Sequence, residues 1–165
     1  MGMSANIVHA RVDYRLIHGQ VITKWLKQCD AKRIVIIDDK LSKDEFLGSV
    51  YKMAAPTGIK ADIISVDEAQ RRWADDDFYG GAPVLLLFKT VDMAVAAVQA
   101  GVSFTKLQIG GLENKPGRKI VHNQISLDKA DAEKLAGIEA SGSEIYFQTI
   151  PGEEVESLAQ VSAKL

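Results

Sequence analysis

Reactive side chains gather near the start of the chain, in the stretch Arg11-Val12-Asp13-Tyr14-Arg15-Leu16-Ile17-His18-Gly19. It holds a histidine, a carboxylate and two guanidinium groups. A neutral imidazole can take up a phosphoryl group and give it away again. A guanidinium can bind phosphate through two parallel hydrogen bonds. These residue types favour anion binding and phosphoryl chemistry centred on His18.

The neighbouring elements predict where His18 lies. A strand pattern ends near Val12 and a helix pattern begins near Gly19, which places His18 at a helix N-terminus and at the carboxyl edge of a sheet. Free N–H groups and the positive end of the helix dipole make such a position an anion site. The same field disfavours imidazolium, so we expect a neutral, nucleophilic ring near pH 7. Asp13 can hold the other ring N–H or pair with Arg15, and the sequence leaves both open.

Strand and helix patterns alternate along the whole chain. Several strand candidates are continuous apolar runs, which is typical of strands buried on both faces of a parallel sheet. The predicted strands are Asn6–Val12, Arg33–Asp38, Ala61–Ser65, Val84–Phe88, Lys106–Ile109, Ile120–Ile125 and Ile145–Thr149. Helical periodicity and start signals predict helices at 19–28, from 42, from 65 to about 73, and at 91–100, 128–140 and 152–164.

This alternation predicts an α/β fold in a single domain spanning residues 1–165. We expect a doubly wound, mostly parallel sheet of about seven strands with helices on both faces. Ile120–Ile125 follows Lys106–Ile109 without a helix between them, so it is predicted to be an antiparallel edge strand. In the helix after Ser42, an inner apolar stripe is predicted from Phe46, Leu47, Val50, Tyr51 and Ala54.

Composition excludes several classes of protein. Twenty Lys and Arg against 22 Asp and Glu give a net charge of −2, which argues against a generally basic nucleic-acid binder. Cys29 is the one cysteine, so an internal disulfide is excluded. The longest apolar run, Val84–Phe88, is far shorter than the ~20 residues that span a bilayer. We therefore expect a cytoplasmic protein; Met3 would serve as a start as well as Met1.

Other motifs point to structural roles. His9 lies inside the first strand pattern and is expected to be packed, whereas His122 on the predicted edge strand is expected to face solvent. No histidines or carboxylates have the spacing of metal ligands, and Asp75-Asp76-Asp77 is interpreted as a solvated helix end. Phosphate-loop and dinucleotide fingerprints are absent, because Gly80-Gly81 and Gly110-Gly111 lack the required spacing.

Nearly the whole chain resembles one known family. The string Arg11-x-Asp13-x-Arg15-Leu-Ile-His18-Gly-Gln-Val, followed by Trp25, resembles the phosphorylation-site signature of IIB components in the mannose/fructose/sorbose family of the sugar phosphotransferase system. Ala54–Lys60 is similar to the family's Ala-Pro-x-Gly-Val-Lys segment. Gln108–Leu112 with Pro116–Lys119 is similar to its Gly-Gly loop and Gly-Lys step, and Ile150-Pro151 to its last strand-to-helix junction.

The resemblance implies a role for each matching residue. His18 is expected to be the phosphohistidine, modified at Nδ1, with Arg15 and Asp13 assisting the transfer. Arg11 and Gly19 are expected to help bind the phosphoryl group, and Tyr14 stands where many members carry Asp. Thr57, Lys60, Gly110 and Gly111 are candidates for a partner or phosphate loop. Arg11, Arg15, Lys24 and Lys60 form a possible basic rim for an acidic partner.

The implied activity is that of a protein-phosphohistidine–sugar phosphotransferase. A IIA protein donates the phosphoryl group, and the phosphohistidine passes it to a sugar held by membrane IIC and IID subunits, with which the chain associates peripherally. No cofactor or metal is implied, nucleic acid is not a partner, and a homo-oligomer stays open. Two alternatives remain: a non-catalytic phosphate- or small-ligand-binding module on the same fold, and a regulatory docking protein.

Overall fold

The computed structural model describes residues 4–165, so the possible start at Met3 lies outside the described part. A seven-stranded sheet has the order β3-β2-β4-β1-β5-β8-β9. Neighbouring strands are parallel except for β8 and β9, which are antiparallel. The strands are β1 (Asn6–Asp13), β2 (Arg33–Ile37), β3 (Lys60–Ile64), β4 (Pro83–Phe88), β5 (Lys106–Gly111), β8 (Glu144–Phe147) and β9 (Glu156–Ser157). The predicted fold class, with one antiparallel edge strand, is confirmed.

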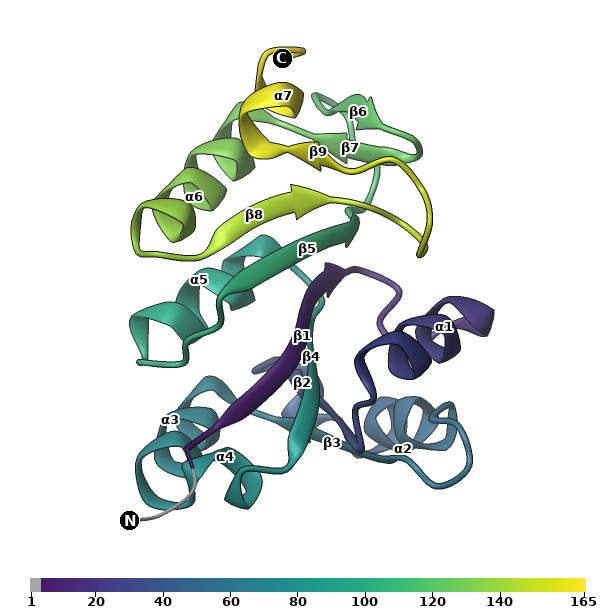
Figure 1. Cartoon of the computed structure of the whole chain (residues 1–165), viewed down its shortest axis with the longest axis vertical. Coiled ribbons are helices and arrows are strands. Elements are labelled where there is room, and N and C mark those ends of the chain that lie inside the picture. The colour runs from purple at the N-terminus through teal and green to yellow at the C-terminus, as the bar shows by residue number, and fades with distance from the viewer. Residues whose placement is uncertain (1–3) are drawn as a thin grey trace.

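Helices cover both faces of the sheet (Figure 1). On one face lie α3 (Val66–Asp75), α5 (Val91–Gln99) and α6 (Lys129–Ala140); on the other lie α1 (Gly19–Cys29) and α2 (Glu45–Met53). Three shorter elements complete the chain: the 3₁₀ turn η1 (Leu41–Lys43), α4 (Asp77–Gly80) and α7 (Leu158–Ser162). Within residues 4–165, no helix is long and apolar enough to cross a membrane.

The apolar run in β4 explains why the predicted strands lack alternation. Leu85 and Leu87 pack into the core beneath α1, whereas Leu86 packs into the core beneath α3 and α5. All three side chains are fully buried. Each face of the strand therefore needs apolar residues, as expected for a parallel sheet between two helical layers.

The predicted edge strand Ile120–Ile125 is wrong in its details. That segment is split into β6 (Lys119–His122) and β7 (Ile125–Leu127), which form a separate two-stranded antiparallel sheet. The antiparallel edge is β9, inside the stretch predicted to be a helix from Gly152. His122 is only 5% exposed, contrary to expectation, because its Nδ1 lies 2.7 Å from Glu156 of β9.

Helix α2 is rotated relative to the predicted stripe. Asp44 rather than Ser42 caps it, and Gly48 is its buried residue, close to Ile63 of β3. Phe46 and Met53 consequently point outward, 76% and 84% exposed. Close approach of the helix at Gly48 decides which apolar side chains reach the core.

Candidate functional site

The first strand places two charged residues at the carboxyl edge of the sheet. Arg11 and Asp13 are two positions apart on β1, so their side chains lie on the same face. In the pairing with β5, Val12 faces Ile109 and Asp13 faces Gly111, so the register skips Gly110. This irregularity places Gly110 directly against the guanidinium of Arg11. Any Cβ at position 110 would overlap the guanidinium, so the close approach requires glycine.

The loop after β1 presents His18 to the site. The N–H of Leu16 donates to the carbonyl of Asp13 at 2.9 Å, and Leu16 and Ile17 are buried against the core beneath α1. These contacts anchor the loop. They leave Tyr14 and Arg15 exposed and put His18 at the N-cap of α1 in an extended conformation.

Asp13 contacts both of its candidate partners, His18 and Arg15. Its Oδ2 lies 3.0 Å from Nε2 of His18, and its Oδ1 accepts the backbone N–H of Arg15 at 3.0 Å and Arg15 Nε at 3.4 Å. Burial acts to raise the pKa of Asp13, but the hydrogen bond from His18, the charge of Arg11 and the Arg15 amide lower it overall. An ionised carboxylate is only an acceptor, so the His18 ring donates to it through Nε2–H.

The helix N-terminus adds donors beside this ring. The His18 side chain makes no capping hydrogen bond, and the first turn of α1 holds no acidic residue. Gly19 follows at φ +49° with open space around it. Free backbone N–H groups at such a terminus attract anions. The His18 side chain is 21% exposed, so a reacting group can reach it from solvent.

Arg15 is the accessible cation of the site. Its side chain is 45% exposed and its guanidinium lies 5.4 Å from the ring centroid of Tyr14. Arg15 lines a cavity of about 500 Å³ together with Gly110, Gly111 and Thr149. The structure thus brings Arg15, Asp13, His18, Gly19 and the Gly-Gly pair to one edge of the sheet.

Arg11 lies in the site but behind Asp13, at 1% exposure. Its Nη2 donates to Asp13 Oδ2 and to the Thr149 carbonyl, each at 3.1 Å. Its Nη1 donates to Gln108 Oε1 and to the Gln148 carbonyl. With these donors engaged and no access to solvent, Arg11 does not share the exposed position of Arg15.

Sequence reasoning missed several polar neighbours. Gln108 is fully buried in β5 and its Oε1 also lies 3.0 Å from His9 Nε2. Asn123 donates to Glu153 at 3.0 Å, and Glu153 accepts from the Thr149 hydroxyl. A signal for Gln108 existed, because a lone amide inside the apolar run before Gly110 marks a buried polar contact. Asn123 and Glu153 carried no such signal.

Other candidates lie elsewhere. Lys60 opens edge strand β3 opposite Arg33, the first residue of β2, and exposed Thr57 precedes it, so both are at the amino edge, away from His18. Lys24 is exposed on α1. His9 is packed as expected, stacked on Trp25 with 4.9 Å between ring centroids. Burial lowers the pKa of His9, and Arg11 adds to this.

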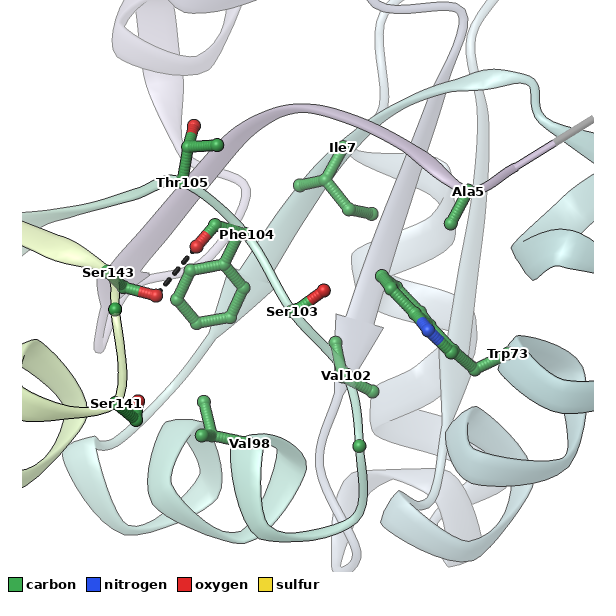
Figure 2. Close-up of a pocket in the computed structure, with 12 residues that line it drawn as sticks. Ala5, Ile7, Trp73, Val98, Val102, Ser103, Phe104, Thr105, Ser141 and Ser143 are labelled. Carbon is green, nitrogen blue, oxygen red and sulfur yellow. Dashed lines mark hydrogen bonds between the residues drawn. The ribbon is translucent and has the colours of Figure 1, made fainter.

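A cavity of about 570 Å³ lies near the amino ends of β1 and β5 (Figure 2). Figure 2 shows Trp73, Phe104 and Ser103 on its wall, and the Ser143 hydroxyl donates to the Phe104 carbonyl at 2.6 Å. The described residues that line it include no titratable side chain. This cavity therefore offers no acid–base side chain, in contrast to the edge of the sheet that holds Asp13 and His18.

Comparisons with known proteins show which family this chain is similar to. The sequence model of the "PTS system sorbose subfamily IIB component" family matches residues 7–164. A sorbose-specific EIIB component of Lacticaseibacillus casei is 34% identical, over 87% of each chain. A mannose-specific EIIAB component of Escherichia coli is 32% identical over 86% of this chain, which spans 43% of that protein. The crystal structure of manxB from Thermoanaerobacter tengcongensis superposes with a TM-score of 0.91 at 38% identity, covering 99% of this chain and 98% of that one.

Proposed function

Because the chain belongs to the sorbose subfamily of IIB components of the sugar phosphotransferase system, we propose that it carries a phosphoryl group on His18. The chain accepts the group from a IIA protein and transfers it to a sugar. One observation carries the proposal: His18 Nε2 is tied to the buried Asp13 carboxylate at 3.0 Å while the ring stays reachable from solvent. Nδ1 is therefore the nitrogen available to phosphorus.

Acceptance of the phosphoryl group is an in-line displacement. The Nδ1 lone pair forms a bond to phosphorus as the bond between phosphorus and the donor's leaving atom breaks, and that electron pair stays with the donor. The Nε2 proton remains between the ring and Asp13, whose charge stabilises the positive charge that grows on the ring. In transfer to a sugar, a hydroxyl oxygen of the sugar forms the new bond to phosphorus as the Nδ1–phosphorus bond breaks. The electron pair of the broken bond returns to Nδ1, and the hydroxyl proton is released to water or to a base of the sugar-binding subunit.

Positioning and charge neutralisation account for most of the catalysis in such transfers. Arg15 is the exposed guanidinium beside His18 and can bind the equatorial oxygens of the moving group. The first-turn N–H groups of α1, from Gly19 onward, supply neutral donors. Gly110 and Gly111 keep backbone rather than side chains at the wall of the adjoining cavity.

The names of relatives support the choice of partners. The Escherichia coli relative is a mannose-specific EIIAB component, which joins IIA and IIB in one name, so a IIA protein is the proposed donor. The acceptor is a sugar presented by membrane IIC and IID subunits, to which this chain would bind peripherally from the cytoplasm. Both partners must bring reacting atoms to within ~3.5 Å of Nδ1.

The proposal is tested by labelling. The purified chain is incubated with IIA protein that has been phosphorylated from labelled phosphoenolpyruvate. We expect an acid-labile, base-stable label that is absent in His18→Ala and retained in His122→Gln, which removes a histidine outside the site. A folded wild-type chain that takes up no label would overturn the carrier function and favour a ligand-binding or docking module. Label retained in His18→Ala would overturn the assignment of His18.

A further inference from the structure

We propose that Arg11 is a positioning residue that fixes the proton of His18 on Nε2 by holding the Asp13 carboxylate against the end of β8. This inference rests on the proposed function, in which Nδ1 of His18 is the nucleophile. Arg11 itself touches neither the phosphoryl group nor its donor in this arrangement. It acts through Asp13.

The guanidinium of Arg11 joins two strands and the segment that follows a third, β8. It extends from β1, and its Nη2 bridges Asp13 Oδ2 and the carbonyl of Thr149, both at 3.1 Å. Its Nη1 reaches Gln108 of β5 and the carbonyl of Gln148, the residue after β8, at 3.3 Å. The indole of Trp25 donates to the same Thr149 carbonyl at 3.2 Å. One buried cation thus connects the carboxylate that holds His18 with the segment that follows β8.

The surroundings suit the fork of arginine. The planar guanidinium satisfies a carboxylate, a side-chain amide and two carbonyls at once, whereas a lysine ammonium can keep the charge beside Asp13 but not all four hydrogen bonds. Its Cζ lies 5.7 Å from the centroid of Trp25, and the missing side chain of Gly110 leaves room above it. Gln108 fixes the fork from the far side, since its Oε1 accepts from Arg11 and contacts His9.

Arg11 also controls where the proton lies. Within the described part of the chain, the hydrogen-bond partners of Asp13 Oδ2 are Arg11 and His18, and the Asp13 side chain is 1% exposed. Without Arg11 the buried carboxylate keeps only the half-exposed Arg15 as a cationic partner, so the Asp13–His18 pair binds an additional proton up to higher pH. An imidazolium has no lone pair on Nδ1 and cannot attack phosphorus.

The other titratable groups near this pair have partners other than Asp13. His9 lies beyond Gln108, and the Tyr146 phenol of β8 interacts with Arg11 rather than with Asp13. Glu153 lines the cavity beside Arg15 but hydrogen-bonds Thr149 and Asn123. Arg11 and Arg15 are therefore the cations that hold the charge of Asp13.

The first experiment measures the tautomer directly. The ¹⁵N resonances of the His18 ring are recorded by NMR on the unphosphorylated wild type, Arg11→Met and Arg11→Lys. We expect Nε2–H in the wild type, a mixture containing imidazolium or Nδ1–H at pH 7 in Arg11→Met, and substantial return to Nε2–H in Arg11→Lys. A folded Arg11→Met chain with the wild-type tautomer would overturn the inference, as would a lysine that gives no return.

The second experiment follows the rate of phosphoryl acceptance against pH. Arg11→Met should be at least tenfold slower than the wild type at pH 7 and should recover as the pH is raised, whereas Arg11→Lys should keep the wild-type pH midpoint. A merely structural role would lower the amount of folded protein and leave the midpoint unchanged. An unchanged midpoint in Arg11→Met therefore contradicts the inference.

A third variant tests the inference even if Arg11→Met does not fold. Gly110→Ala forces the guanidinium to move while the charge remains, so it should slow acceptance and shift the His18 resonances. Gly137→Ala on α6, with open space around the added Cβ, is the matched control and should change neither. Unaltered His18 resonances in folded Gly110→Ala would refute the inference. If the wild type carries no label, the proposed function fails, yet the tautomer readout still decides the role of Arg11.

Discussion

The Asp13 carboxylate organises the site because both of its oxygens are used. Oδ1 accepts from the backbone and side chain of Arg15, and Oδ2 accepts from Arg11 and His18. Its pKa is lowered from 3.8, since these partners outweigh the effect of burial. The stability that the ionised group contributes is therefore complete above pH 3.8 and is lost as the pH falls through the lower folded-state value.

Arg15 is expected to act on the phosphoryl group itself. Its guanidinium is half exposed on the same carboxylate as His18, so its removal would take away the proposed cation for the moving oxygens and leave the buried Arg11–Asp13 pair intact. We predict that Arg15→Ala slows acceptance at least tenfold, about 1.4 kcal/mol of barrier. Rapid-quench labelling of Arg15→Ala measures this rate, with exposed Lys27→Ala on α1 as the control. A wild-type rate in Arg15→Ala would remove Arg15 from the mechanism.

The sequence predicts which residues meet at the site better than it predicts what each one does. A strand-to-helix turn was sufficient to place Arg11, Asp13 and His18 near one sheet edge. The choice of partner for Asp13 depended on side-chain geometry, and the carboxylate turned out to have an oxygen for each. Burial of Arg11 depended on the register of β1 against β5, which skips Gly110, and no local pattern encodes that pairing.

At the scale of elements, helix α2 shows how packing overrides periodicity. Its apolar residues recur at helical spacing, which predicts a buried stripe. The helix instead packs against the sheet at Gly48, whose missing side chain allows a close approach to Ile63. Residues on the opposite side of the wheel, such as Phe46 and Met53, then point to solvent.

Substitutions at two apolar positions near the start of α2 are predicted to differ greatly in their effect on the free energy of unfolding. Leu41 is buried in the core beneath α1, so Leu41→Ala should lower the free energy of unfolding by about 2–5 kcal/mol. Phe46 is 76% exposed, so Phe46→Ser should change it by less than about 0.5 kcal/mol. Urea denaturation of both variants provides the measurement. A large loss in Phe46→Ser would mean that this face of α2 is covered in solution.

The segments after β5 were harder to predict than those before it. Before β5, each strand is followed by a helix and returns in parallel, so periodicity and right-handed crossover are sufficient. Beyond Gly111 the chain forms the β6–β7 hairpin, and β9 consists of only two residues, Glu156 and Ser157. Strands this short carry no periodic signal, and their pairing is decided by tertiary contacts such as that between His122 and Glu156.

At the scale of the whole molecule, a cluster of charged groups holds the C-terminal segment on the fold. Glu156 of β9 lies 2.7 Å from His122 Nδ1 and accepts from Lys164 Nζ at 2.8 Å. The same ammonium donates to the carbonyl of Val121 at 2.7 Å. These contacts join the hairpin and the sheet edge to the residues that follow α7. Figure 1 shows β6, β7, β9 and α7 together at one end of the molecule.

This cluster makes stability depend on acid pH in a defined direction. Hydrogen bonds from Lys164 and His122 lower the pKa of Glu156 from 4.5. Its stabilising effect is therefore complete above pH 4.5 and disappears as the pH falls through the folded-state value. Glu156→Gln should lower Tm at pH 7, and its difference from the wild type should shrink progressively below pH 4.5. Calorimetry from pH 3 to pH 7, roughly bracketing the carboxyl range, measures both chains.

Glu154→Gln, an exposed neighbour with no ion pair among residues 4–165, is the control and should match the wild type throughout. A Glu156→Gln deficit that stays constant with pH would show that the carboxylate contributes shape rather than charge, and the electrostatic account of this end of the molecule would be wrong.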